Sequence, residues 1–118
     1  MLFRSPVNVI YTGTHDNNTS LGWFEEDASS AEIANLSRYL GREVNRRTAA
    51  GEMVRMAMSS VAETAVVPMQ DHLELGASCR INIPSTPTGN WAWRMMPGQA
   101  DERLASCLRE LTELYGRA

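Results

Sequence analysis

The sequence predicts an α/β fold in which two parallel strands are each followed by helices. Continuous β-branched and apolar runs at residues 7–11 and 64–69 are typical of buried parallel strands, because half-exposed strands alternate apolar and polar residues. Segments with helical periodicity follow each run, and no hairpin signal occurs between them. The resulting order of strand, helices, strand and helix is that of two βα units.

The first unit begins with the run VNVIY at residues 7–11, which is long enough for one buried strand and too short for a helix. Gly13 then lets the backbone turn, so His15 and Asp16 lie where the strand passes into a loop. A short helical turn is predicted at residues 21–26. The end of this strand is therefore a candidate site.

Two longer helices follow in the first unit. Ser29 and Glu32 have the spacing of a capping box, and apolar residues recur at i, i+3 and i+7 before Gly41, which suits a helix C-terminus. A second helix is predicted over residues 48–63 from one apolar stripe.

The second unit begins with the strand predicted at residues 64–69, which also ends in polar residues. Gln70, Asp71 and His72 could form a site like the first polar cluster, but Asp71 is also well placed to N-cap the turn that follows it, and the cap is favoured. Residues 79–93, rich in Pro, Gly, Asn and Thr, predict a long ordered loop, and such loops often carry function. A last helix is predicted from Ala100 to Gly116.

Two βα units cannot bury a parallel sheet by themselves, because its strands need cover on both faces and neighbours at both edges. A TIM barrel has eight such units, and its active site is built from loops at the carboxyl ends of the strands. Both polar clusters of this chain follow strand ends of that kind. We therefore expect the 118 residues to be the end of a larger α/β domain.

Composition excludes several classes of partner. The formal net charge is −3, so no basic field favours nucleic acid or an anionic membrane surface. No apolar run approaches the roughly 20 residues of a membrane span. Cys79 and Cys107 show no metal or disulfide spacing, so we expect a cytoplasmic setting. Residues 1–5 read like a translated sequencing-adaptor tail, and we expect them to be a non-native leader to residues 6–118.

The His15-Asp16 pair has several chemical interpretations. It could hydrogen-bond sugar hydroxyls, bind a metal or act in acid/base catalysis. Alternatively, Asp16 and Asn17 cap backbone groups in an Asx turn that also contains His15. A metal site made of His15, Asp16, Asp71 and His72 would lack any fixed-spacing signature, so no metal is expected.

The loop of the second unit carries further candidates. Trp91 and Trp93 alternate, which in an extended segment places both on one side as a platform for sugar rings. Core packing is the alternative for both. Arg80 and Asn82, beside the rigid Pro84, could hold a hydroxylated ligand or only fix the loop.

Four motifs in order resemble the 4-alpha-glucanotransferase family, also called amylomaltases or disproportionating enzymes. They are YTGTHDN at residues 11–17, PMQD at 68–71, RINIP at 80–84 and GNWAWR at 89–94. The resemblance extends from about residue 6 to the last helix. It implies the carboxyl-terminal portion, about two βα units, of a TIM (β/α)8 barrel and not a complete barrel.

The resemblance also implies a reaction. The family transfers α-1,4-glucan segments between maltooligosaccharides of starch and glycogen metabolism by a retaining double displacement, which needs a nucleophile, a general acid/base and a third acidic residue. By the motif match, Asp16 is this third residue, which stabilises the transition state. His15 binds the same sugar, and Asn82 and Pro84 line the substrate groove.

The nucleophile and the acid/base of the family have no counterpart in this sequence, so the isolated chain is expected to be inactive. The resemblance implies no cofactor, and it implies α-1,4-glucans and the rest of the parent barrel as partners. The chain departs from the family at Ser85 and Glu74, where Gly is usual or common.

Two interpretations from other classes remain open. One is a non-catalytic carbohydrate-binding module that uses Trp23, Trp91 and Trp93. The other is a small metal-dependent hydrolase built on His15 and Asp16.

Overall fold

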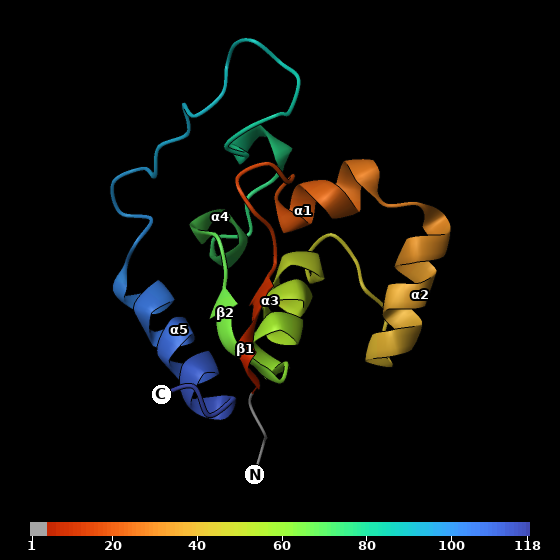
Figure 1. Ribbon diagram of the computed structural model, residues 1–118, viewed down its shortest axis with the longest axis vertical. Helices are drawn as coiled ribbons and strands as arrows, with labels where there is room; N and C mark the ends of the chain where they lie inside the picture. Colours follow the sequence, from red (N-terminus) through yellow and green to blue (C-terminus); the bar gives the residue numbers. More distant parts are fainter. Residues whose placement is uncertain (1–4) are drawn as a thin grey trace.

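The computed structural model describes residues 5–118 and contains a two-stranded parallel sheet with helices (Figure 1). Strand β1 spans Ser5–Tyr11 and strand β2 spans Ala62–Val66. They pair in parallel with Tyr11 opposite Val66. The predicted α/β class and the parallel pairing are confirmed. The expected leader at residues 1–5 lies outside the described residues, apart from Ser5, which begins β1.

The first helices form largely as predicted from their caps. Helix α1 spans Ser20–Gly22 and continues into the π-helical turn η1, Trp23–Asp27. Helix α2 spans Ser30–Leu40, and Ser29 and Glu32 form the reciprocal capping box. It ends at Gly41. There φ is 74°, a left-handed conformation that glycine adopts without steric cost.

The second long helix is shorter than its periodicity predicts. Helix α3 spans Ala49–Ser59, and β2 begins at Ala62, so the predicted boundaries at residues 63 and 64 are wrong. Val61 fits both the apolar stripe of the predicted helix and the apolar run before the strand, so the pattern does not mark the boundary. Carbonyls around this junction accept hydrogen bonds from the guanidinium of Arg117, which supports the early end of the helix.

The second unit continues with short helices and the expected loop. Helix α4 spans Met69–His72 and the 3-10 turn η2 spans Ala77–Cys79. An irregular segment then runs to residue 101, longer than predicted. Helix α5 spans Glu102–Leu114 and is N-capped by Asp101, close to its predicted limits.

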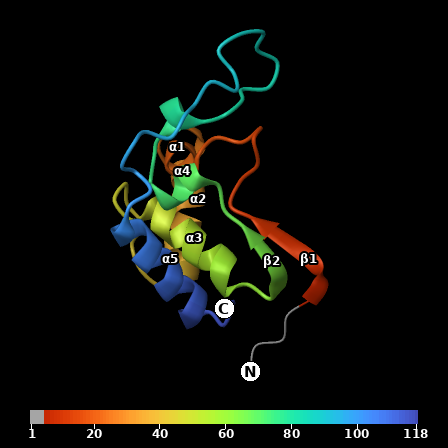
Figure 2. The ribbon, with the colours of Figure 1, turned by 90° about the vertical axis from the view of Figure 1, so that its left-hand side faces the viewer.

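The helices lie on one side of the two strands, with β1 at the outer edge (Figure 2). The small core consists of Leu21, Val44, Ala49, Ala50, Val54, Ala57 and Ala62. By contrast, Val7 is 87% exposed, and Val9 and Tyr11 are also exposed on β1. Within residues 5–118, the sheet therefore lacks cover on one side. None of the helices in this part is long and apolar enough to cross a bilayer.

Candidate functional site

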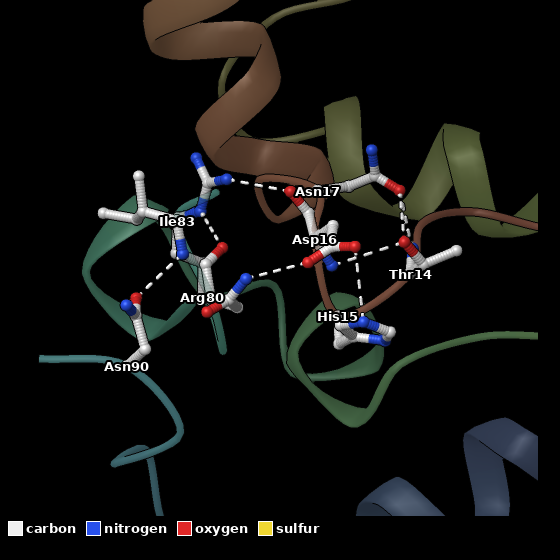
Figure 3. A network of polar contacts seen from close by, with 8 residues as sticks. Thr14, His15, Asp16, Asn17, Arg80, Ile83 and Asn90 are labelled. Carbon is white, nitrogen blue, oxygen red and sulfur yellow. Dashed lines mark hydrogen bonds and ion pairs between the residues drawn. The ribbon is translucent and has the colours of Figure 1, made fainter. Parts of the chain in front are cut away.

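The candidate site is formed by two loops that meet beyond the strands (Figure 3). In the loop after β1, the side-chain oxygen of Asn17 accepts hydrogen bonds from the Thr14 amide at 2.8 Å and from the Thr14 hydroxyl at 3.0 Å. The amide of Asp16 donates to the Thr14 hydroxyl at 3.3 Å. Asn17 therefore forms the turn, as one of the alternatives expected, while the Asp16 carboxylate is available for other contacts.

The structure brings together His15, Asp16 and Asn82. Oδ1 of Asp16 accepts a hydrogen bond from Nδ2 of Asn82 at 2.8 Å, across 66 positions of sequence. Oδ2 of Asp16 lies 3.3 Å from Nε2 of His15, and both side chains are about half exposed. Pro84 is exposed in the same loop as Asn82 and stays a predicted substrate contact.

Arg80 joins the two loops through their backbones. Its Nε donates to the carbonyl oxygen of Asn82 at 3.0 Å, and its Nη2 donates to the carbonyl oxygen of Asp16 at 3.0 Å. Of the two roles open to this side chain, the structure shows the one that fixes the loop.

Trp91 forms the aromatic side of the site. Its ring lies against the His15 imidazole, with centroids 5.0 Å apart and planes tilted by 36°. The Trp91 side chain is exposed, whereas Trp93 and Trp23 are less so. Trp91 has a φ of 59°, so the segment is not extended there. This angle does not decide whether the Trp91 and Trp93 side chains lie on one side, which stays a prediction.

Asp71 does not N-cap the turn after it, and that prediction is wrong. It lies inside α4, is 2% exposed, and accepts hydrogen bonds from the Thr12 hydroxyl at 2.6 Å and from the Ser20 amide and hydroxyl at 2.8 Å each. Its partners precede it by 51 and 59 residues, so no local pattern could have revealed them. Asp71 therefore ties both ends of the His15-Asp16 loop to the second unit.

His72 faces another part of the molecule. It lines a cavity of about 780 Å³ together with residues of α3 and α5, and neither His15 nor Asp16 lines that cavity. Burial lowers the pKa of His72 below its usual 6.5, against the opposing effect of Asp71.

Among residues 5–118 no three metal-ligating side chains converge, so His15, Asp16, Asp71 and His72 are not brought together as a metal site.

The chemistry of these groups suits a hydroxylated ring. A carboxylate accepts hydrogen bonds from sugar hydroxyls, a carboxamide can both donate and accept, and an exposed indole offers a flat apolar face. All three stand beyond the carboxyl ends of parallel strands, where α/β proteins place their sites. Fold and site thus define the class of α/β proteins with a polar and aromatic site at the carboxyl ends of parallel strands.

Comparison with known proteins identifies the family. The family model described as 4-alpha-glucanotransferase matches residues 4–100, and the chain belongs to this family. The 4-alpha-glucanotransferase of Synechocystis sp. is 47% identical over 109 residues, covering 92% of this chain and 21% of the relative. That of Thermus thermophilus is 43% identical over 115 residues, covering 92% and 22% respectively.

A solved structure is similar as well. The amylomaltase from Streptococcus agalactiae in complex with acarbose matches with a TM-score of 0.87 and 33% identity, covering 97% of this chain and 23% of that chain. The chain thus spans about a fifth of the length of the relatives it matches.

Proposed function

We propose that this chain is part of a 4-alpha-glucanotransferase in which Asp16 stabilises the transition state of α-1,4-glucan transfer. The observation that carries the proposal is the half-exposed Asp16 carboxylate, which Asn82 and His15 contact from two sides. Membership of the family and the family's name support the reaction type. The substrates proposed are maltooligosaccharides, as both donor and acceptor.

In this mechanism a carboxylate nucleophile attacks the anomeric carbon and forms a covalent glycosyl-enzyme, while a carboxylic acid protonates the leaving sugar. A hydroxyl of the acceptor glucan then attacks the intermediate. Asp16 acts in both steps, because its negative charge stabilises the positive charge that develops on the sugar ring. His15 donates a hydrogen bond to the same sugar. The nucleophile and acid/base belong to the rest of the protein, so the chain alone is inactive.

The proposed architecture is the carboxyl-terminal portion of a TIM barrel, formed by residues 6–118. The uncovered side of the sheet and the exposed side chains of Val7 and Val9 on β1 support it, because a buried parallel sheet has neighbours and cover at those places. The rest of the barrel is then the main protein partner. A cytoplasmic location is proposed with it.

The test uses a chimeric enzyme in which residues 6–118 replace the matching segment of the Synechocystis relative. The chimera is expected to convert maltotriose into glucose and longer maltooligosaccharides. Asp16→Asn should lower kcat on the order of 10²–10³-fold with little change in KM, because the contact is stronger in the transition state than in the ground state.

The matched control is Asp101→Asn. It removes the same charge from an exposed carboxylate, and Asn caps helices as well as Asp does, so the start of α5 is preserved. The control should transfer glucan at the unchanged rate. Near-normal turnover of the Asp16→Asn chimera would refute the proposed role.

A further inference from the structure

We propose that Arg80 is a positioning residue that fixes the placement of the Asp16 carboxylate against the substrate. This inference rests on the proposed function. Hydrogen bonds fix the backbone at Arg80 on both sides of the residue. Its amide donates to the Ala77 carbonyl at 3.1 Å, at the end of η2. The preceding Cys79 carbonyl accepts a hydrogen bond from the buried Gln70 of α4 at 3.2 Å.

From this anchored backbone, the guanidinium reaches across to the other loop. It donates to the Asp16 carbonyl and to the Asn82 carbonyl, each at 3.0 Å. The side-chain nitrogen of Asn82 in turn donates to the Asp16 carboxylate at 2.8 Å. Figure 3 shows Arg80 and Asp16 on facing loops. The three residues therefore form a closed ring of hydrogen bonds, in which both the backbone and the carboxylate of Asp16 are held.

The geometry is specific to arginine. A planar guanidinium directs Nε and Nη2 at two acceptors at once, whereas the ammonium of lysine is a single point donor on a flexible stem. Among residues 5–118 no carboxylate lies within ion-pair distance of Arg80, so its charge does not balance a neighbouring acid there. The Arg80 guanidinium therefore contributes by fixing the position of the Asp16 loop.

The turn around Asp16 does not depend on Arg80, because Asn17 and Thr14 form it within the loop. Loss of the guanidinium fork should therefore leave the loop folded but free to shift relative to Asn82. A shift of about 1 Å in a catalytic group can cost on the order of 10²-fold in rate.

The experiment uses the chimeric enzyme and compares kcat with KM. Arg80→Lys should lower kcat about 10- to 100-fold while KM changes less than about threefold, because an ill-placed charge weakens mainly the transition state. Arg80→Gln keeps one neutral donor nitrogen, and it should lower kcat and leave KM nearly unchanged in the same way. Both are assayed well below their melting transitions.

A double-mutant cycle separates positioning from general stability. If Arg80 acts through Asp16, adding Arg80→Lys to the Asp16→Asn chimera should lower kcat by less than about threefold more. The matched control is Arg117→Lys, since Arg117 also donates to several backbone carbonyls, at Met58, Ser60 and Ala62. It should lower the melting temperature and leave kcat unchanged.

The outcomes are distinguishable. If Asp16→Asn lowers kcat as expected but both Arg80 variants keep normal kcat, the inference on Arg80 is wrong and the proposed function stands. The same holds if the double variant loses kcat by the product of the losses of the two single variants. If Asp16→Asn keeps normal turnover, or if chimeras with the Synechocystis and Thermus thermophilus relatives are both inactive, the proposed function fails and this inference fails with it.

Discussion

Removal of the Asp71 carboxylate should loosen the loop that carries Asp16, even though Asp71 itself lies in α4. Three donors, the Thr12 hydroxyl and the amide and hydroxyl of Ser20, depend on this carboxylate. The hydroxyls can rotate to other partners, but the Ser20 amide cannot, and Ser20 is only 3% exposed. A buried amide without a partner costs about 1–3 kcal/mol, and hydrogen bonds to charged groups contribute roughly 1.5–3 kcal/mol each. Asp71→Ala should therefore cost about 3–5 kcal/mol.

Hydrogen exchange measured by mass spectrometry on the chimera reports this local effect. A loss of about 3 kcal/mol should accelerate amide exchange over residues 12–20 on the order of 10²-fold. Asp71→Asn should accelerate it much less, because its oxygen still accepts from the Ser20 amide and both hydroxyls can turn to accept from its nitrogen. Asp27→Ala removes an exposed carboxylate with one side-chain partner and is the control. If Asp71→Ala changes exchange no more than Asp27→Ala does, the proposed anchoring is wrong.

Two further predictions concern the stability of the chimera. Gly22→Ala should cost about 1–3 kcal/mol, because its Cβ would lie 2.9 Å from the Cα of Ala77. Gly51→Ala, whose added Cβ would lie in ordinary van der Waals contact with Oε1 of Glu74 at 3.6 Å, should gain about 0.5–1 kcal/mol instead. Urea denaturation that ranked the two variants in the reverse order would contradict the packing argument. Because burial lowers the pKa of His72, stability should fall as pH drops below about 6.5, where the unfolded chain takes up the proton first. Melting temperatures at about pH 5 and about pH 8 should differ less in His72→Gln, and an equal difference would exclude this histidine as the cause.

The sequence predicts those features that depend on neighbouring residues. The capping box of Ser29 and Glu32 and the left-handed Gly41 are local, and both are confirmed. The start of β2 at Ala62 is not local, because pairing with β1 and the guanidinium of Arg117 decide where α3 ends. The same reason explains the wrong prediction for Asp71.

Two residues at which the sequence departs from the family pattern have a left-handed backbone. Glu74 and Ser85, at which the resemblance to the family implies Gly as the usual or common residue, have φ angles of 56° and 66°. A left-handed backbone costs roughly 1–2 kcal/mol at a residue other than Gly. These two turns therefore carry backbone strain that glycine would not have at the same positions.

The sequence predicts three residues that meet at the candidate site, but not how they are connected. The motif match selected His15, Asp16 and Asn82, and the structure brings them together. Sequence reasoning left Arg80 open between a ligand contact and a loop contact, because both roles use the same donors. Only the facing position of two loops decides between them.

These contacts bear on whether the site survives outside its own parent protein. The second unit holds the Asp16 loop at three residues: Thr12 and Ser20 through Asp71, and Asp16 through Arg80 and Asn82. All of these contacts lie within residues 5–118. Within residues 5–118, the placement of Asp16 therefore depends on the mutual position of the two βα units. A transplant that moves both units together should preserve it, whereas one that divides them between α3 and β2 should not.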